Sequence, residues 1–476
     1  MTALVPIALL AVSFTRPMER VTTMDPALSR SVYDAHAIAL VYETPLRIDY
    51  AARPYALVPG ACELPEVSED GLRYRFRMRS RGASAADVAR SLERLRDPET
   101  VSPNAWIVKD VDVVAATPDG SALDIVLKRR VRYFPWLMAM PPCAVVPADG
   151  SATGPYELAS WWRNHEMTFR RRDGAKDGFD TVRYLVVDDA STQWLMFMKG
   201  ELDFLESISR DNWDSAVGPD GRLVRELRDA GVTLHSMPTL EVMYTGINMR
   251  DPVLGRNRKL RQAMNCAFDF PAWTKFYNNR VKECDGPVPP GVPERLDTPF
   301  AYRFNLEKAK RLVAEAGYPG GIDPATGRRL TLTLSIGRAS QESREAGELM
   351  AAFYERIGVK LELDFMTWDA FLKAVNEGRV QMYRMGWVGD YPDAQNFLQL
   401  FYGPNRSPGV NHSNFENADF DAAYEKEDFA KCQEIVREEC PWVFTHYNMS
   451  HSLVGPRVKN FIPSDFPYGS ERYYRP

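Results

Sequence analysis

Hydrophobic and polar residues alternate strictly from Leu72 to Met78, with arginines between leucine, tyrosine, phenylalanine and methionine. A period of two predicts a strand that buries one of its faces. Ser84 then precedes a helical pattern over 85–95, which it is suited to cap, and a second strand is predicted over 123–128. We interpret residues 49–153, which contain these elements, as one small α+β unit.

A different rhythm starts after residue 180. A strand predicted over 182–187 is followed by an amphipathic helix over 191–199 and by a short strand over 202–205. A strand, a helix and a second strand in this order predict a parallel sheet with a right-handed crossover.

The same rhythm recurs more clearly in the second half of the chain. Asn305 begins a predicted helix that ends at Gly317. Strands and helices then alternate, with strands at 330–336, 360–365 and 380–388 and helices at 341–357 and 367–377. Ligands bind beyond the carboxyl ends of the strands in open α/β sheets, so Asp390, just after the last of these strands, is expected beside a binding site.

Two places in the sequence join the α/β halves. The chain passes from the first half to the second near 240–248, and it is predicted to return near 442–447. Two lobes joined by two crossings are the layout of a hinged ligand-binding protein. The predicted first lobe, inserted domain and second lobe have the bounds 20–48 with 154–241 and 445–476, then 49–153, then 242–444.

The composition limits the class of protein. The 476 residues exceed what one hydrophobic core usually supports, which agrees with several domains. The chain has 59 Lys and Arg against 64 Asp and Glu, a net charge of -5. A mildly acidic chain without basic blocks argues against nucleic acid as a partner.

An apolar run from Ala3 to Phe14 is too short to span a bilayer. It is similar to the hydrophobic region of an export signal, but the first cation, Arg16, follows the run instead of preceding it. The run is therefore either an incomplete export signal or an N-terminal strand. We expect no transmembrane segment in the rest of the chain.

The six cysteines do not form a metal or redox motif, because none of them belongs to a CxxC pair. Cys432 and Cys440 fall in one predicted helix, and the rise between them, about 12 Å, excludes a disulfide. A disulfide between Cys266 and Cys284 stays open as an alternative.

No familiar catalytic motif is present: GxSxG, HExxH, GxGxxG and the P-loop pattern are all missing from the sequence. Of the six histidines only His446 and His451 lie close together, which is not a helical ligand spacing, so no metal or other cofactor is expected. Asp390 and Asp393 are a conceivable pair of catalytic carboxylates. Asp393 is also suited to cap a helix that starts near Ala394, and this is the interpretation we prefer.

The stretch from Arg384 to Gly403, RMGWVGDYPDAQNFLQLFYG, is the most informative part of the sequence. It places Arg384 six residues before Asp390, with Trp387 between them. Six extended residues cover at most about 20 Å, and a peptide of three to five residues spans roughly 10–18 Å. The two charges are therefore able to hold the two ends of a short peptide. The alternatives are a turn-forming role for Asp390 and a surface ion pair between Arg384 and a neighbouring acid.

Four aromatic residues are further candidates for ligand contacts. Trp387 is expected either as a wall of the binding site or as a core residue of its strand. Tyr42, Tyr244 and Tyr402 are weaker candidates, since tyrosines of this kind are more often structural.

Six segments carry a family resemblance along nearly the whole chain: MDPALSRSVYDAHAIALVYETPLRID, AADVARSLERLRDP, TGPYEL, MYTGINMRDPVLGRNRKLRQAMNCAFD, LEKAKRLVAEAGYPGG and MGWVGDYPDAQNFLQLFYGPN. In this order they resemble the extracellular solute-binding proteins of family 5, the peptide, oligopeptide and nickel-binding components of ABC importers. Any one segment is weak, but six in order are a strong signal.

The resemblance implies an α/β fold of the two-lobed periplasmic-binding-protein type (type II), with an extra α+β domain inserted in the first lobe. It also implies that Asp390 binds the α-ammonium of a peptide and that Arg384, as in some oligopeptide binders, binds the α-carboxylate. The expected protein is not an enzyme. It captures peptides in an interlobe cleft and delivers them to the permease subunits of an ABC importer, and it is periplasmic or extracytoplasmic and monomeric.

Three stretches, 79–83, 147–153 and 425–431, are shorter than the family pattern. They leave open that the chain is a shortened version of a longer parent. Two alternative functions also stay open. One is the same fold binding a nickel chelate, an oligosaccharide or haem, although the scarcity of close histidine pairs counts against nickel. The other is a hydrolase that uses Asp390 and Asp393.

Overall fold

The computed structural model describes residues 12–79, 82–175, 178–466 and 468–476. The chain forms two compact units: unit 1 is Met1–Met237 with Ser450–Pro476, and unit 2 is Pro238–Met449. Both crossings between the units lie inside strands, the first in β12 (Thr233–Ile247) and the second in β17 (Trp442–Val454). Each crossing falls within a few residues of the position expected from the sequence.

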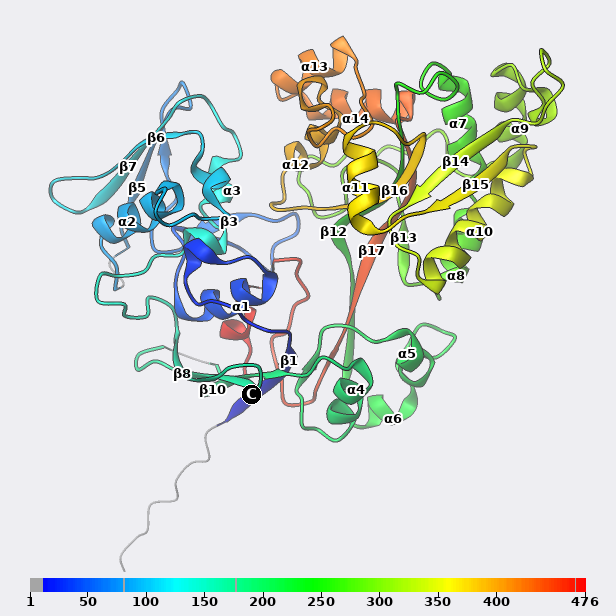
Figure 1. The fold of residues 1–476 in the computed structure, drawn as a ribbon. Coiled ribbons are helices and arrows are strands. Elements are labelled where there is room, and N and C mark those ends of the chain that lie inside the picture. The colour runs from blue at the N-terminus through cyan, green and yellow to red at the C-terminus, as the bar shows by residue number, and fades with distance from the viewer. Residues whose placement is uncertain (1–11, 80–81, 176–177, 467) are drawn as a thin grey trace, which may run out of the picture. The chain divides into compact units, whose positions relative to one another are not determined.

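Ten described strands of unit 1 form two four-stranded sheets, in the orders β1-β10-β9-β8 and β4-β5-β7-β6, and the antiparallel pair β2-β3, while the short strand β11 pairs with β17 instead (Figure 1). The strands are β1 Ser13–Met18, β2 Leu46–Ile48, β3 Leu57–Pro59, β4 Glu66–Val67, β5 Arg73–Arg77, β6 Val111–Ala116, β7 Ala122–Leu127, β8 Tyr156–Trp162, β9 Glu166–Arg171, β10 Thr181–Val186 and β11 Phe204–Leu205. The helices are α1 Val32–Val41, α2 Ala85–Arg96, α3 Phe134–Leu137, α4 Ala190–Met198, α5 Arg210–Ala216 and α6 Arg225–Asp229, with 3-10 turns at Pro26–Leu28, Ala105–Val108, Pro141–Cys143 and Ser470–Tyr473.

The alternating pattern that predicted β5 is confirmed. Tyr74 and Phe76 are buried, and the three arginines between and beside them are exposed. The predicted helix is α2, and Ser84 caps it through a capping box: its side chain accepts the N–H of Asp87, whose carboxylate accepts the N–H of Ser84. β5 belongs to the separate sheet β4-β5-β7-β6 of unit 1, whose four strands all lie inside residues 49–153.

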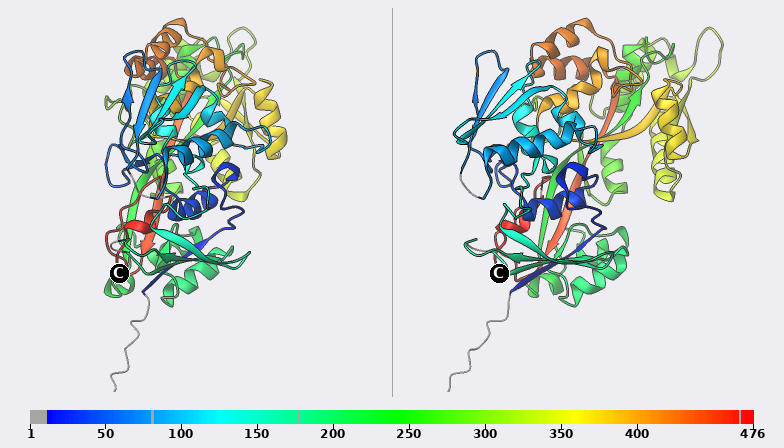
Figure 2. Two further views of the ribbon diagram at one scale, coloured as in Figure 1. Left: turned by 90° about the vertical axis from the view of Figure 1, so that its left-hand side faces the viewer. Right: turned by 60° about the vertical axis from the view of Figure 1, so that its left-hand side comes forward.

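The predicted parallel pairing of β10 with β11 is wrong. The strands and the helix α4 between them exist, but the parallel partner of β10 is β1, and β11 pairs antiparallel with β17. Hydrophobic periodicity predicts where a strand lies but not which strand it pairs with. The parallel partner of β10 is β1, near the start of the chain. Most of the apolar run over 3–14 lies outside the described residues. The chain ends beside β1, where the rings of Phe14 and Tyr474 are 5.5 Å apart (Figure 2).

Unit 2 contains the predicted alternation of parallel strands and helices. Its elements are α7 Arg258–Ala267, α8 Phe270–Phe276, β13 Val281–Glu283, α9 Leu306–Glu315, β14 Thr331–Ile336, α10 Gln341–Glu355, β15 Lys360–Phe365, α11 Trp368–Asn376, β16 Met382–Val388, α12 Ala394–Leu398, α13 Ala418–Glu425 and α14 Phe429–Glu439, with 3-10 turns at Pro319–Gly321, Gln399–Phe401 and Gly403–Asn405. The strand order is β11-β17-β12-β16-β14-β15, with β13 beside β17. Both β15 and β16 run parallel to β14, which confirms that prediction.

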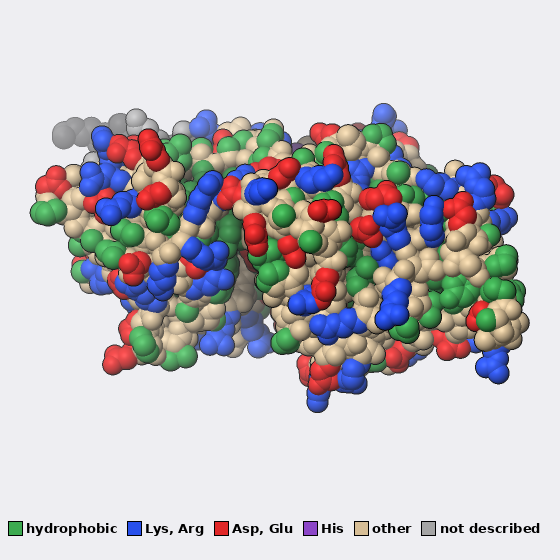
Figure 3. Space-filling model, turned by 90° about the horizontal axis from the view of Figure 1, so that it is seen from above, with side chains coloured by type: hydrophobic (Ala, Val, Ile, Leu, Met, Phe, Trp, Pro, Cys, Tyr) green, Lys and Arg blue, Asp and Glu red, His purple; other side chains and the backbone are tan. Residues whose placement is uncertain are grey.

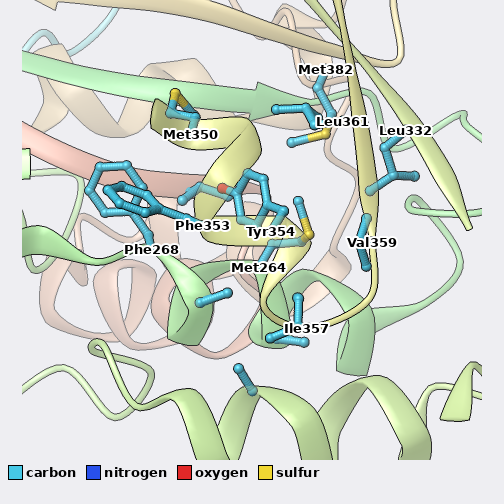
Figure 4. Close-up of a cluster of buried hydrophobic side chains, with 14 of the residues drawn as sticks. Met264, Phe268, Leu332, Met350, Phe353, Tyr354, Ile357, Val359, Leu361 and Met382 are labelled. Atoms are coloured by element: carbon cyan, nitrogen blue, oxygen red, sulfur yellow. The ribbon is translucent and has the colours of Figure 1, made fainter. Parts of the chain in front are cut away.

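The main core of unit 2 is packed between α10 and these strands. Met350, Phe353 and Tyr354 of α10 are buried against side chains of the strands and of α7 (Figure 4). Fully burying one such side chain stabilises the fold by roughly 1.5–3 kcal/mol. This core fixes β14, β15 and β16, and so fixes where their carboxyl ends lie.

Gly358 allows α10 to end close to the neighbouring backbone. Its φ angle is 81°, and a side chain there would overlap the carbonyl group of Gly320. Gly378 follows the end of α11 with a similar φ angle of 66°, but a Cβ there would make only ordinary contacts. The two glycines therefore differ in packing more than in backbone conformation.

All six cysteines are unpaired and buried, so the alternative of a Cys266–Cys284 disulfide is wrong. Burial raises the pKa of the thiols, to about 12 for Cys62 and about 11 for Cys266. Positive and negative side chains are interspersed over the face shown in Figure 3, in keeping with the small net charge of -5. None of the helices in the described ranges has the length and apolar character needed to cross a membrane.

Candidate ligand-binding site

Arg384 lies in the middle of β16, opposite Thr245 of β12 and Ile336 of β14. One end of its guanidinium, Nη2, donates a hydrogen bond of 2.8 Å to the hydroxyl of Tyr277, which follows α8. The guanidinium carbon lies 5.5 Å from the centre of the Trp273 ring, a cation–π distance. Two aromatic residues thus hold the cation without neutralising it.

A buried histidine beside this cation is also neutral. The indole N–H of Trp273 donates to Nδ1 of His446 at 3.1 Å. Burial, with the charge of Arg384 as a second cause, lowers the pKa of His446 to about 3. His446 is therefore uncharged at neutral pH, and its ring completes a neutral setting for Arg384.

No carboxylate in the described part of the chain pairs with Arg384. Glu342 interacts with the hydroxyl of Tyr277 but not with the guanidinium itself. The alternative that Arg384 belongs to a surface ion pair is therefore wrong. Its side chain is only partly buried.

Asp390 follows the carboxyl end of β16 by two residues, as predicted. Its side chain is open to solvent, but the surrounding protein removes part of its water, and this burial raises the pKa of the carboxyl. Its N–H donates to Oδ1 of Asn396 at 3.3 Å, and Nδ2 of Asn396 donates back to Oδ2 of Asp390 at 3.3 Å. No cation among the described residues pairs with this carboxylate.

Trp387 lies between these two charged residues in sequence but not on the same side as Arg384. Side chains alternate between the two faces of a strand, so residues three apart point to opposite faces. The indole N–H of Trp387 donates to Oδ1 of Asn396 at 2.9 Å, which brings this ring toward α12 and Asp390. The structure thus groups Trp387 with Asp390 and groups Arg384 with Trp273 and Tyr277.

Asp393 caps α12, as we preferred. It is buried, and its carboxylate accepts the N–H of Gln395 at 2.9 Å. A carboxylate committed to a helix cap is a poor second member of a catalytic pair with Asp390.

The three tyrosine candidates differ in their surroundings. Tyr244 is fully buried and stacked on Trp442 with ring centres 3.4 Å apart, so the expectation that it contacts a ligand is wrong. Tyr402 stacks on Tyr424, and its hydroxyl donates to Glu425 at 2.8 Å. Tyr42 is half-buried in unit 1 and lines a small cavity of about 50 Å³ there. It remains a candidate from unit 1.

The comparison with protein families decides the class. The model of bacterial extracellular solute-binding proteins, family 5 (Middle) matches residues 56–409, most of the chain. The chain belongs to this family. Family 5 is a family of solute-binding proteins and not of enzymes, so the resemblance found in the sequence is confirmed.

Individual proteins are also similar to the chain over most of their length. Heme-binding protein A of Haemophilus influenzae is 25% identical, over 87% of this chain and 83% of that protein. The dipeptide-binding protein of Escherichia coli is 23% identical, over 91% and 88%. The solved structure of MppA, a periplasmic murein tripeptide-binding protein in its unliganded open form, matches with a TM-score of 0.85 at 20% identity, covering 98% of this chain and 97% of that one. The predicted periplasmic-binding-protein fold is confirmed.

Sequence reasoning missed Asn396, Tyr277 and the role of Trp273 in this family 5 protein. Asn396 lies in the same segment as Asp390, six residues later, and an asparagine inside a predicted helix was the signal that could have found it. Trp273 and Tyr277 come from a segment more than a hundred residues before Arg384, and no pattern in the sequence links them to it. No cluster of metal-binding side chains occurs in the described ranges, His446 and His451 included.

Proposed function

We propose that this chain is the substrate-binding component of an ABC importer that captures peptides by their charged ends. The observation that carries the proposal is the carboxylate of Asp390, which is fixed at the carboxyl end of β16, open to solvent and unpaired with any described cation. A partly desolvated carboxylate without a partner is costly, and a ligand ammonium supplies the missing charge. The peptide α-ammonium is the common group of this kind.

Arg384 is the proposed partner of the peptide α-carboxylate. Its guanidinium is held by neutral groups and keeps its charge for a ligand. The extended chain between Arg384 and Asp390 covers at most about 20 Å, which suits a peptide of about three to five residues. The proposed ligand is therefore a short peptide with both ends free.

Arg384→Gln is expected to weaken binding of a free-acid peptide by roughly 10- to 100-fold, the range of one charge-assisted hydrogen bond to a charged group. The affinity for the same peptide with an amidated C-terminus should change little, because the amide presents no negative charge. Calorimetry with the two peptides measures both effects. Arg328→Gln, which removes an exposed arginine from the same unit, is the control for net charge. Equal losses for acid and amide would contradict the role of Arg384.

Haem is a second candidate, since one of the similar proteins is named for it. Haem carries carboxylates and no ammonium, so it would engage Arg384 and leave Asp390 unpaired. Mass spectrometry of molecules that co-purify with the protein separates the two ligands. A mixture of peptides supports the proposal, whereas haem alone, a nickel chelate or a glycan would overturn it.

The remaining parts of the proposal follow from the family. A protein of this kind acts outside the cytoplasm, delivers its ligand to the permease and catalyses no reaction. We propose that it works as a monomer and that the two strands β12 and β17, which both cross between the units, provide the hinge for ligand capture. Turnover of peptides that is lost in Asp390→Asn would instead revive the hydrolase alternative.

A further inference from the structure

Asn396 joins two of the proposed ligand-binding residues through one side chain. Its Oδ1 accepts the indole N–H of Trp387 at 2.9 Å and the backbone N–H of Asp390 at 3.3 Å, while its Nδ2 donates to the Asp390 carboxylate at 3.3 Å. The residue itself is only 1% exposed, so a ligand has no access to it. Asn396 can therefore affect ligand binding only through the residues that it contacts, Trp387 and Asp390.

The chemistry of these partners fixes which way the amide faces. An indole N–H and a backbone N–H only donate, so the oxygen of Asn396 must face them. An ionised carboxylate only accepts, so the amide nitrogen must face Asp390. Rotating the amide by half a turn would place donors against donors and the amide oxygen against the carboxylate. The orientation shown is the one that satisfies all three contacts.

The backbone around Asn396 is held as well. Asp393 caps α12 three residues earlier, and the side chain of Gln399 donates to the Asn396 carbonyl at 3.0 Å. A side chain whose backbone is held in this way can in turn fix the groups that it binds.

We propose that Asn396 is a positioning residue for ligand recognition, in which one buried amide holds the ammonium-binding carboxylate of Asp390 and the indole of Trp387 in their binding orientations. This inference rests on the proposed function, because it assumes that Asp390 binds an ammonium group.

The amide also favours the ionised form of Asp390. Burial raises the pKa of this carboxyl, and the hydrogen bond from Asn396 lowers it. The other titratable groups on the elements around Asp390 form hydrogen bonds with other residues. Asp393 caps α12, and Glu294 accepts the N–H of Ala394. The hydroxyls of Tyr391 and Tyr424 both bond to the side chain of Gln395, and Glu241 accepts from the side chain of Asn448.

The ionisation of Asp390 determines how ligand binding depends on pH. An ammonium ligand needs ionised Asp390, so binding is kept above the pKa of Asp390 and lost as the pH falls through it. Removing the N–H donor of Asn396 raises that pKa further, and the loss of binding then begins at a higher pH. A residue with a merely structural role would lower affinity without moving this midpoint.

Two variants separate the contacts of the amide. Asn396→Ala removes all three, whereas Asn396→Asp keeps an acceptor for Trp387, removes the donor to Asp390 and adds a like charge. We expect about a tenfold loss of affinity for a free-amine tripeptide at neutral pH in Asn396→Ala. We expect the pH midpoint of binding to rise from the parent protein to Asn396→Ala and again to Asn396→Asp. Calorimetry from acidic to neutral pH on the full chain measures both.

Asn411→Ala is the matched control. Asn411 is a fully buried asparagine of the same unit whose amide donates to the carbonyl groups of Tyr402 and Phe415. Its replacement should lower thermal stability but leave the pH midpoint where it is in the parent protein. Circular dichroism identifies a variant that fails to fold, and Asn396→Asp, which differs least in shape, then carries the test alone.

The outcomes are distinguishable. If both Asn396 variants keep the midpoint of the parent protein while Asp390→Asn abolishes the preference for free-amine peptides, the positioning role is wrong and the proposed function stands. If the parent protein itself binds free-amine and N-acetylated peptides equally, the proposed function fails, and the positioning role fails with it. A rise of the midpoint in the Asn396 variants but not in Asn411→Ala supports the inference.

Discussion

Asp390→Asn is expected to weaken binding of free-amine peptides by roughly 10- to 100-fold, because it removes the charge from a hydrogen-bonded ion pair that contributes about 1.5–3 kcal/mol. Asparagine has the same shape and keeps an oxygen to accept from Nδ2 of Asn396. The loss therefore reports the charge of Asp390 and not a change in packing. N-acetylated peptides, which carry no ammonium, should lose little affinity.

The experiment compares the two peptides by calorimetry in the parent and variant proteins. Asp419→Asn serves as a control, since it removes the same charge from an exposed position of the same unit. The pH dependence adds an independent check. Because burial raises the pKa of Asp390, the parent protein should release free-amine peptides as the pH falls, and Asp390→Asn should not show this dependence. Equal losses for both peptides would remove Asp390 from the ammonium site.

Gly358→Ala is expected to have the largest effect on stability. A left-handed backbone costs a non-glycine residue about 1–2 kcal/mol. In addition, the new Cβ would overlap the carbonyl group of Gly320, and overpacking of this kind costs typically 1–3 kcal/mol. We therefore expect the free energy of unfolding of unit 2 to fall by about 2–5 kcal/mol in total.

Gly378→Ala separates the two costs. It places alanine at the end of α11 with a similar φ angle, but its Cβ meets no backbone atom at close range. Only the backbone cost of about 1–2 kcal/mol should appear. Urea unfolding followed by circular dichroism measures both variants. If the two substitutions destabilise equally, the close approach of Gly358 to Gly320 contributes nothing.

The strands and helices of unit 2 were predictable because their signals are local. Asn305 and Gly317 bound α9, and the alternation of hydrophobic and polar residues gave β14 and β15 to within a residue. The position of Asp390 beyond β16 followed from chain order alone. The pairing of strands was not predictable in the same way. β10 pairs with β1, which is far from it in sequence, and hydrophobic periodicity does not specify which strands pair.

The candidate site shows the same division. The two charged residues were proposed from the sequence, because their types and spacing suit a ligand with two charged ends. Whether Arg384 had an acid beside it could not be known, since an answer requires the surroundings of that one side chain in three dimensions. The sequence also placed Trp387 between the two charges, whereas strand alternation and the bond to Asn396 turn its ring to the side of Asp390.

The burial of the six cysteines has a practical consequence. All six lie in the described residues, and burial raises the pKa of their thiols, to about 12 for Cys432. Thiolates are the reactive form, so these side chains should resist maleimide reagents in the folded protein. A cysteine introduced as Val388→Cys, at a position that is 64% exposed, would then be the one site that takes a dye. Two residues from Asp390, such a dye would turn ligand arrival into a change of fluorescence, without the removal of any native cysteine.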